Sequence, residues 1–592
     1  MSTDTSEKGL EALILRAMTG RTDVLVPAHV ATETSVPVAG GTGWLLGDAN
    51  HFDRDFCLDL VQLRGFLLAN QPDVLESLAL GSDGPTRRKF LARLQGEISR
   101  RGTIDVLRHG LKHGPHQIDL FYGTPSAGNA PARERFAANR FSVCRQLRYS
   151  RDETKRALDL GLFINGLPVA TFELKNNLTK QTVADAVEQY QLDRDPREKL
   201  FEFGRCIVHF ALDDQEVRFC THLQGKESWF LPFNRGWNDG AGNPPNPDGL
   251  KTAYLWQQIL TRSGLTDILE NYAQIVERKD DKTGRKTRQQ IWPRFHQLDM
   301  VRRLLADVAQ NGPGHRYLIQ SSAGSGKSHS ITWLSHQLVE LRRDDAPVFD
   351  SILVVTDRRI LDQQIRDTIK QFAQVSSTVG HAQDAGDLRR FLTEGKKIII
   401  TTVQKFPVIL DEIGSEHRDR HFAIIIDEAH SSQGGRNAAA LALALSSGGA
   451  ELEEESTEDK INRLMEAKKM LPNASYFAFT ATSKNKTLEI FGLAIPQPDG
   501  TVRHRPFFSY TMKQAIQEGF ILDVLRHYIP VESYYKLIKT IENDPQFDSK
   551  KAKKKLRSYV ESHEHAIQIK AEIMVDHFHE QVLALFKIGG EA

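Results

Sequence analysis

The stretch RYLIQSSAGSGKSHSITWLSHQL, residues 316–338, decides the fold class of the second half of this 592-residue chain. The apolar run RYLIQ predicts a short buried strand, and ITWLSHQL predicts the helix that follows it. Between them lie Gly324, Ser325, Gly326, Lys327 and Ser328. Glycines let backbone N–H groups close around phosphate oxygens, and a helix N-terminus adds a favourable dipole. The stretch therefore predicts a phosphate-binding loop.

In a loop of this kind the polar side chains have expected roles. Lys327 would reach the β- and γ-phosphates of ATP, and Ser328 would bind Mg²⁺. The three residues before Lys327 would form the cradle for the phosphates. Ser321 stands at the first position of the full pattern, where glycine is usual. We therefore expect ATP and Mg²⁺ as ligands of this half of the chain.

A second motif follows about 100 residues later, where the apolar run at 424–426 ends in two acids, Asp427 and Glu428. Asp427 would hold Mg²⁺ through water, and Glu428 would polarise the water that attacks the terminal phosphate. Together the two motifs predict a nucleotide hydrolysis site.

The second half of the chain repeats one pattern. From about residue 290, short apolar runs alternate with polar or helical stretches: RYLIQ, SILVVT, KIIITT, FAIIIDE and SYFAFTAT. Short buried strands that alternate with helices predict a parallel α/β sheet. Functional loops would then lie at the carboxyl ends of the strands.

These motifs resemble those of DEAH-type helicases of superfamily 2. Residues 294–297 (RFHQ) are similar to the adenine-recognition motif, which implies that Phe295 stacks on the base and that Gln297 bonds its edge. Further segments match that family's contacts with the DNA backbone or its coupling motif, at 356–358, 401–404 and 479–482. Ser483 follows the last of these where proline is common. The resemblance covers about residues 290–500 and implies a RecA-like lobe.

The first half of the chain contains a separate pair of acids. Asp159 precedes Glu173 by fourteen residues, and Lys175 lies two residues after Glu173. The acids lie in strand-like runs, LDLGLFI and VATFELK, on either side of the turn NGLP. A hairpin would bring Asp159 beside Glu173, so that both carboxylates and the Leu174 carbonyl could hold Mg²⁺. Lys175 would orient or help deprotonate a water that attacks phosphorus.

Other acids are alternatives in the same region. Asp119 also ends an apolar run, HQIDLFYG, although it lies farther along the chain from Glu173. Glu134, on a preceding predicted helix, is a candidate assisting acid. Glu173 and Lys175 share one face of an otherwise apolar strand, where charges usually have a function. The shorter separation from Glu173 favours Asp159 over Asp119.

The set Asp159, Glu173 and Lys175 resembles the PD-(D/E)xK nuclease signature. A QxxxY motif often follows the lysine in restriction-type nucleases of this kind. Tyr190 is present here, but Ala186 stands where the glutamine belongs. Gln189 and Tyr190 are therefore candidates for DNA positioning, or else ordinary helix-face residues.

A nuclease placed before a DEAH-type motor resembles the restriction subunit of type I restriction-modification enzymes. Long phrases across nearly the whole chain carry this resemblance: INGLPVATFELKN, FLPFNRGWNDGAGNPPNP, RFHQLDMVRRLL, SAGSGKSHSI and KQAIQEGFILDVL. Type III enzymes put the nuclease after the motor. The resemblance implies double-stranded DNA as substrate and a complex with modification (methyltransferase) and specificity subunits. S-adenosylmethionine would belong to those partners.

Four segments are predicted from these patterns. They are a PD-(D/E)xK nuclease domain at 1–235, a linker with connecting helices at 236–285, a first RecA-like lobe at 286–510, and at 511–592 the start of a second lobe. The polar stretch at 277–290 predicts an exposed connection. The later motor motifs, including an arginine finger, are missing from the sequence. The resemblance therefore implies an N-terminal fragment, and we expect it to bind ATP weakly without translocating.

Composition restricts the protein class. The net charge is +1, which does not by itself indicate a nucleic-acid binder. Basic residues gather at 86–114 and 550–557, where they could neutralise phosphates or form solvated helix faces. The scattered cysteines argue against a zinc site and a disulfide framework, and suit a reducing cytoplasm; they are Cys57, Cys144, Cys206 and Cys220. No apolar run is long enough to span a membrane.

Two other interpretations remain open on the sequence alone. The chain could be a non-catalytic docking module that binds ATP or partner subunits without chemistry. It could also be a repair helicase with an accessory nuclease. The long phrases shared with type I restriction subunits argue against the repair helicase. The presence of Asp159, Glu173 and Lys175 favours an active nuclease over a docking module, whereas the missing second lobe favours the docking module for motor chemistry.

Overall fold

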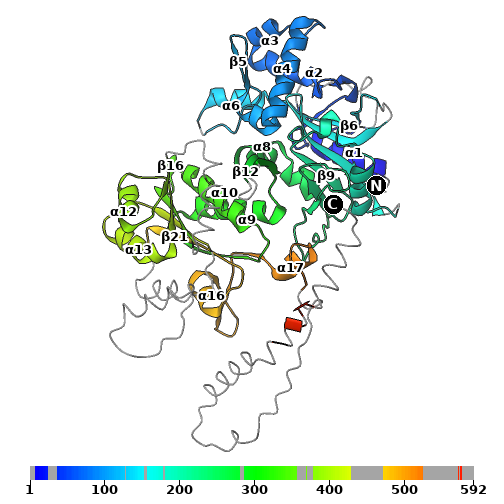
Figure 1. Ribbon diagram of the computed structural model, residues 1–592. Coiled ribbons are helices and arrows are strands. Elements are labelled where there is room, and N and C mark those ends of the chain that lie inside the picture. The colour runs from blue at the N-terminus through cyan, green and yellow to red at the C-terminus, as the bar shows by residue number, and fades with distance from the viewer. Residues whose placement is uncertain are drawn as a thin grey trace, which may run out of the picture. The chain divides into compact units, whose positions relative to one another are not determined.

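The structure is a computed structural model, and the chain divides into two compact units, Met1–Ile521 and Leu522–Ala592. The residues that the structure describes are 7–24, 37–126, 128–152, 156–177, 180–279, 286–356, 369, 378–427, 471–523, 568, 571–572 and 574–575. The two sheets, the helices around them and the candidate sites described below all lie in the first unit (Figure 1).

A seven-stranded mixed sheet forms the core of the first half of the chain. Its order is β1-β6-β7-β8-β9-β10-β11. The strands are Leu45–Leu46, Phe141–Arg148, Ala157–Ile164, Leu167–Leu174, Val208–Leu212, Val217–Cys220 and Leu231–Pro232. Neighbours are antiparallel except for β1 with β6 and β8 with β9, which are parallel.

Strand β8 is buried at every position, because helices cover both of its faces. Helices α1 (Glu7–Thr19) and α5 (Thr103–His109) contact it, and so does α7 (Val183–Leu192). A strand covered on both faces loses the apolar–polar alternation of a surface strand. Polar residues within β8 therefore lie in the protein interior.

The hairpin predicted around the NGLP turn is present. Strands β7 and β8 are antiparallel, and the turn residues Asn165 and Gly166 have φ angles of 51° and 84°. A two-residue turn with positive φ at both positions matches the twist of the flanking strands. A Cβ on Gly166 would lie 2.3 Å from the backbone oxygen of Asp59, so this position also requires glycine for space.

Further helices pack around this sheet. They are α2 (Leu60–Asn70), α3 (Pro72–Leu78), α4 (Pro85–Arg101) and α6 (Ala130–Ala137). Short two-stranded ribbons lie among them, β2 with β3 (Phe52–Asp53, Leu58–Asp59) and β4 with β5 (Leu111–His113, His116–Ile118). All four cysteines are buried free thiols.

The segment expected to connect the two halves is more structured than predicted. Helix α8 spans Arg262–Asn271, and the polar stretch after it forms two paired strands, β12 (Gln274–Lys279) and β13 (Lys286–Ile291). The sequence predicted an exposed connection at 277–290, and residues 286–289 are indeed exposed, but the pairing of the two strands was not predicted; residues 280–285 lie outside the described residues. Polar side chains suit this ribbon because most of β13 is exposed, and its backbone groups are satisfied by cross-strand pairing.

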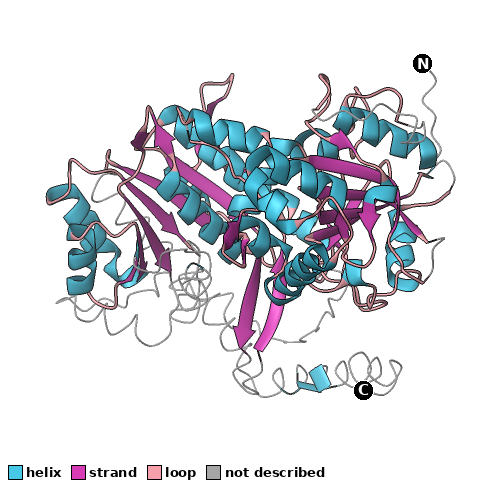
Figure 2. Ribbon diagram, turned by 90° about the horizontal axis from the view of Figure 1, so that it is seen from above, coloured by secondary structure: helices cyan, strands magenta, loops and turns pink. Residues whose placement is uncertain are grey.

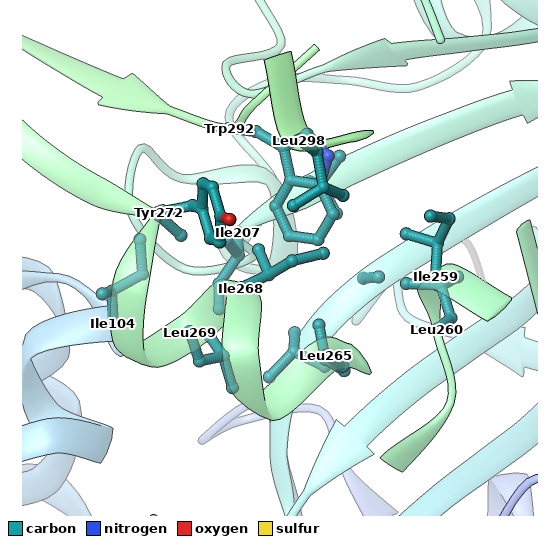
Figure 3. Close-up of a cluster of buried hydrophobic side chains, with 14 of the residues drawn as sticks. Ile104, Ile207, Ile259, Leu260, Leu265, Ile268, Leu269, Tyr272, Trp292 and Leu298 are labelled. Atoms are coloured by element: carbon teal, nitrogen blue, oxygen red, sulfur yellow. The ribbon is translucent and has the colours of Figure 1, made fainter. Parts of the chain in front are cut away.

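Buried side chains join the two halves through α8. Figure 3 shows residues of α5, α8 and α9 (Phe295–Asn311) converging in one apolar cluster that includes Ile268 and Trp292. The ring of Trp292 lies 5.9 Å from that of Phe210 in β9. The two sheets of this unit consequently share a continuous hydrophobic core.

The second sheet has seven strands, all parallel, in the order β18-β19-β17-β20-β21-β14-β24 (Figures 1 and 2). In chain order the strands are Arg316–Ser321 (β14), Ser351–Thr356 (β17), Val379–His381 (β18), Ile398–Thr402 (β19), Phe422–Ile426 (β20), Ala474–Thr480 (β21) and Phe508–Tyr510 (β24). The five apolar runs seen in the sequence are five of these strands. The predicted parallel α/β sheet is confirmed. The short edge strands β18 and β24 were not predicted.

Helices of the second sheet follow its strands in sequence. They are α10 (Lys327–Glu340), α12 (Ala385–Thr393), α13 (Phe406–Ser415), α16 (Asn485–Phe491) and α17 (Met512–Gln517). Two ribbons accompany them, β15 with β16 (Arg342–Arg343, Ala346–Pro347) and β22 with β23 (Leu493–Pro496, Val502–Arg505). Since all seven strands are parallel, their carboxyl ends share one edge of the sheet, where loops can form a site.

Candidate nuclease and ATP sites

Asp159 and Glu173 lie opposite each other on neighbouring strands. The ladder pairs Leu160 with Phe172, and one step farther along both strands brings Asp159 opposite Glu173. Side chains at opposed positions project from the same face of a sheet. The backbone N–H of Leu174 donates to Oδ2 of Asp159 over 2.7 Å. The hairpin thus brings together the two acids that the sequence pattern selected.

Lys175 completes the group at the carboxyl end of β8. It follows Glu173 by two positions, so both side chains leave the strand on the same side, and Lys175 is half-buried. Its charge lowers the pKa of Glu173, whereas the negative charge of Asp159 raises it. All three predicted nuclease residues are therefore close enough to influence one another electrostatically.

Glu173 is held in the interior by an arginine that sequence reasoning missed. Its side chain is 0% exposed, and burial raises its pKa to about 8, an effect that Arg194 partly offsets. The Arg194 guanidinium lies 2.6 Å from Oε1 of Glu173. It also donates to the Ala157 carbonyl over 2.9 Å and lies over the Tyr149 ring. No sequence motif predicts the role of Arg194, because it lies after the end of α7 and outside any helix or strand.

A third carboxylate reaches the group through a glutamine. Glu11 of α1 is 3% exposed, and its Oε2 accepts a hydrogen bond from Nε2 of Gln146 over 2.8 Å. The same Nε2 lies 3.4 Å from Oδ1 of Asp159. Arg145 pairs with the other Glu11 oxygen at 2.6 Å. Glu11 precedes Asp159 by almost 150 residues, so only tertiary structure brings them together.

The alternative acid Asp119 lies at the other end of the hairpin. The carbonyl of its neighbour Leu120 accepts from the Asn165 side chain in the β7–β8 turn, over 2.8 Å. Six residues of extended strand separate that turn from Asp159, which is about 20 Å. Asp119 is exposed and is therefore poorly placed to act with Glu173.

Glu134 is also near the turn. It is an exposed residue of α6, and Asn139, just after that helix, bonds Asn165 over 2.9 Å. The acid that a preceding helix supplies near Asp159 is Glu11 instead.

Tyr190 is part of the protein core. It is 0% exposed, and its hydroxyl lies 2.8 Å from that of Thr171, which in turn bonds Nδ1 of His209 over 2.7 Å. A buried tyrosine in this position orders the back of β8 and has no access to DNA. Gln189 is half-buried on the same helix, and its suggested role in DNA positioning stays a prediction.

The nuclease group has features that suit a divalent cation. Oε2 of Glu173 is buried and has no hydrogen-bond partner, although buried polar atoms are nearly always satisfied. Asp159 stands opposite, and repulsion between adjacent carboxylates would be relieved by a cation. Within the described ranges no cluster of three or more His, Cys, Asp or Glu side chains has metal-ligand geometry. The suitability of this group for a cation therefore depends on the carboxylates of Asp159 and Glu173. Glu11 contributes only indirectly, through its hydrogen bond with Gln146.

The phosphate-binding loop has the predicted strand–loop–helix form. It leaves β14 and enters α10 at Lys327. Gly324 and Gly326 have φ angles of 72° and 75°, a left-handed conformation that side chains disfavour. Lys327 and Ser328 form the first turn of α10, where backbone N–H groups are unsatisfied within the helix and can bind an anion.

Residues of the RFHQ segment brace this loop. Nε2 of Gln297 lies 3.1 Å from the carbonyls of Ser325 and Gly326. Arg294 donates to the Gly324 carbonyl over 2.7 Å, and its guanidinium lies 4.0 Å from the centre of the Phe520 ring. Gln297 therefore contacts the predicted phosphate-binding loop, and its bond with the adenine edge stays a prediction.

Phe295 takes a different place from the one the helicase resemblance implied. Its ring packs edge-on against Phe233 at 5.8 Å and Tyr254 at 5.2 Å, and it is 6% exposed. The ring is committed to the core beneath α9 and is not an open surface for stacking on adenine. This corrects the assignment of Phe295 to the base.

Asp427 lies at the carboxyl end of β20, on the same sheet edge as the phosphate loop. One strand, β21, separates β20 from β14, so the two motifs are about 10 Å apart across the sheet. Asp427 is 5% exposed, and its N–H donates to Val355 over 2.9 Å. Glu428 lies outside the described residues, and its predicted role stays a prediction.

The other helicase-like segments end strands of this sheet. Thr356 closes β17, Thr402 closes β19 and Thr480 closes β21, so all three segments reach the edge that holds the phosphate loop. Residues 357–358 lie outside the described part of the chain. The DNA contacts expected for these segments stay predictions.

The basic cluster at 86–114 is largely paired within the protein. Arg93, Arg100 and Arg101 all lie within 3.0 Å of Glu97, and Arg108 donates to backbone carbonyls around the end of α8. Internal pairing favours a structural role over phosphate binding. The second cluster, 550–557, lies outside the described residues.

Among the described helices, none has the length and apolarity needed to cross a membrane.

Two family models match the chain, one over each sheet. Residues 122–228 match the N terminus of the type I restriction enzyme R protein, and residues 296–558 match the SWI2/SNF2 ATPase family. The first range contains Asp159, Glu173 and Lys175, and the second contains the phosphate loop. The ATPase match and the parallel sheet identify a RecA-like lobe of superfamily 2.

The chain is also similar to individual proteins. The HindI type I restriction enzyme endonuclease subunit of Haemophilus influenzae is 26% identical over 66% of this chain and 35% of its own length. A candidate MjaIXP type I endonuclease subunit of Methanocaldococcus jannaschii is 23% identical over 83% of this chain and 45% of its own. A solved fragment of a candidate HsdR subunit from Vibrio vulnificus YJ016 is 17% identical, covering 62% of this chain and 51% of that one, with a TM-score of 0.25.

The chain spans less than half the length of both curated relatives. Within the chain, the two family-matched regions follow each other in the expected order, nuclease-side sheet first and ATPase sheet second. These matches support an R (endonuclease) subunit of a type I restriction enzyme.

Proposed function

We propose that this chain carries the DNA-cleaving site and the ATP-binding lobe of a type I restriction enzyme, so that ATP-driven DNA translocation leads to non-specific cleavage of both strands. The observation that carries the proposal is the meeting of Asp159, Glu173 and Lys175 at adjacent strand positions. They lie in the same compact unit as a nucleotide-binding sheet. A PD-(D/E)xK nuclease requires this combination of two acids and one lysine.

The proposed cleavage chemistry assigns a role to each side chain. Asp159 and the unsatisfied Oε2 of Glu173 would hold Mg²⁺. Bound Mg²⁺ would act as a Lewis acid for the charge that develops at phosphorus. Lys175 would hold the attacking water and stabilise the same charge. Arg194 holds Oε1 of Glu173 in place and offsets part of the rise in pKa that burial causes.

In the ATP site, the chain's own groups bind and orient the triphosphate. Backbone N–H groups of residues 324–328 would surround the phosphates, and Lys327 would neutralise the terminal ones. Ser328 and Asp427 would hold the accompanying Mg²⁺, while Glu428 would orient the attacking water. Gln297 supports the loop through the Ser325 and Gly326 carbonyls, and it would bond the edge of the base.

The partners proposed for the subunit follow from its family. The DNA sequence would be read by a specificity subunit within a methyltransferase core, and this subunit would bind double-stranded DNA and that core. The cytoplasm is the proposed compartment, because DNA and ATP are both available there.

The test is plasmid cleavage by a reconstituted type I complex that contains the full-length subunit, with ATP and Mg²⁺. Lys175→Ala should abolish cutting and leave DNA-stimulated ATP turnover intact, whereas Lys327→Ala should abolish both. Lys112→Ala, a change at an exposed lysine of β4, is the matched control and should behave as wild type. Continued cutting by Lys175→Ala would refute the proposed nuclease centre. If Lys327→Ala kept both DNA cleavage and ATP turnover, the chain would instead be a docking module, and ATP hydrolysis would take place at another site.

A further inference from the structure

Gln146 has a backbone conformation that its strand does not explain. Its φ angle is 47°, in the left-handed region that costs a residue other than glycine about 1–3 kcal/mol. The residues on either side keep one register with β7, because Arg145 pairs with Leu160 and Leu147 with Leu158. The ladder therefore continues past Gln146 without an inserted residue. Such strain in mid-strand persists only where the surroundings impose it.

The left-handed turn points the Gln146 amide toward two carboxylates. By register, Gln146 stands opposite Asp159. Its Nε2 donates to Glu11 over 2.8 Å and lies 3.4 Å from Oδ1 of Asp159. An amide nitrogen carries two protons and can serve both acceptors at once. A hydroxyl has one proton, and a carboxylate would repel both acids.

The contacts fix the Asp159 carboxylate at both oxygens. Oδ2 accepts from the backbone N–H of Leu174, and Oδ1 faces the Gln146 amide. Glu11 is itself fixed, because Arg145 pairs with its second oxygen. The chain Arg145–Glu11–Gln146–Asp159 therefore links helix α1 to the nuclease group through side chains of neighbouring residues on β6.

Gln146 also borders open space. It is exposed and lines a cavity of about 820 Å³ together with Arg54, Arg145, Arg148 and Arg151. A residue with a solely structural purpose would gain nothing from strain at a solvent-facing position beside a charged group. The strained backbone of Gln146 is explained if its amide must hold Asp159 in one orientation.

We propose that Gln146 is a positioning residue of the nuclease site, whose amide orients Asp159 against Glu11 so that Asp159 and Glu173 bind a divalent cation. The inference rests on the proposed nuclease function and names a residue that acts through Asp159. Groups that orient metal ligands in this way typically change metal affinity or activity about 10- to 100-fold when they are removed.

The decisive variant is Gln146→Gly, because glycine accepts a φ of 47° without strain but has no amide. Its apo melting temperature should equal or exceed that of wild type, while Mn²⁺ affinity of the whole chain, measured by calorimetry, falls about 10- to 100-fold. A merely structural residue would not show this opposite pair of effects. Gln146→Asn, which tolerates the conformation but is one methylene too short, should lose affinity as well.

Asp344→Gly is the matched control, since Asp344 has a φ of 51° in an exposed turn. It should gain stability without any change in Mn²⁺ affinity. In the reconstituted enzyme, Gln146→Gly should raise the Mg²⁺ concentration for half-maximal cleavage and leave ATP turnover unchanged. Wild-type Mn²⁺ affinity and Mg²⁺ dependence in both Gln146 variants would overturn the proposal. Continued DNA cleavage by Lys175→Ala would refute the proposed nuclease function itself. That result can be told apart from failure of the Gln146 proposal, which concerns only the metal dependence of the Gln146 variants.

Discussion

The guanidinium of Arg194 lies 2.6 Å from Oε1 of Glu173, and the two side chains are 6% and 0% exposed. Burial of both charges is costly unless they remain paired. Burial raises the pKa of Glu173, and Arg194 offsets part of that rise beside Asp159. Three consequences of packing and one of loop geometry can be measured.

Breaking the pair should be more harmful than removing it. Arg194→Met leaves Glu173 buried without its cation, and we expect a loss of about 3–5 kcal/mol in stability. The double variant Arg194→Met, Glu173→Gln should recover a large part of that loss, because no uncompensated charge remains. A double-mutant cycle would measure this coupling, with thermal and denaturant unfolding of wild type, both single variants and the double variant. Equal stability of the single and double variants would show that the pair is not energetically coupled.

His209 should make stability depend on pH below neutrality. It is buried, and desolvation, with a smaller effect of His222, lowers its pKa to about 3. The unfolded chain binds a proton near pH 6.5 and the folded chain does not, so this contribution is complete above pH 6.5 and is lost as pH falls toward 3. The expected slope is about 1.4 kcal/mol per pH unit. His209→Asn, which retains a partner for Thr171, should show a shallower acid decline in melting temperature; an unchanged decline would contradict the assignment.

Gly326→Ala should impair nucleotide binding. The residue has a φ of 75°, and a Cβ there would lie 2.4 Å from Nε2 of Gln297. Either the loop or the Gln297 brace must move, and we expect ATP affinity to fall at least about tenfold, a loss of roughly 1.4 kcal/mol. Fluorescent ATP-analogue titration would measure it. Gly84→Ala is the control, since its Cβ would meet nothing within 4 Å, and an equal affinity loss there would implicate general destabilisation.

Ile268→Ala should weaken the core that the two sheets share. Its side chain is 0% exposed in the cluster drawn in Figure 3, and truncations of this kind cost about 2–5 kcal/mol. The exposed Leu68, 63% accessible on α2, is the comparison, and Leu68→Ala should change the melting temperature little. We expect Ile268→Ala to lower the melting temperature of both sheets together. Separate transitions, with only one shifted, would mean that the sheets unfold independently.

Local sequence was sufficient for much of this protein. The phosphate loop, Asp427 at a strand end and the hairpin with Asp159, Glu173 and Lys175 each depend on residues close together in the chain. Their spacing and hydrophobic periodicity predict strands, turns and faces directly, because those follow from backbone geometry. The parallel sheet was predictable for the same reason.

Tertiary structure alone decided the environment of those residues. Arg194 beside Glu173, Glu11 reaching Asp159 through Gln146, and Phe295 packed on Phe233 and Tyr254 all join segments that are distant in sequence or irregular. No local pattern encodes such contacts, since they depend on how whole elements pack. Burial and pairing, which set the pKa of Glu173 and the orientation of Asp159, exist only once that packing has formed.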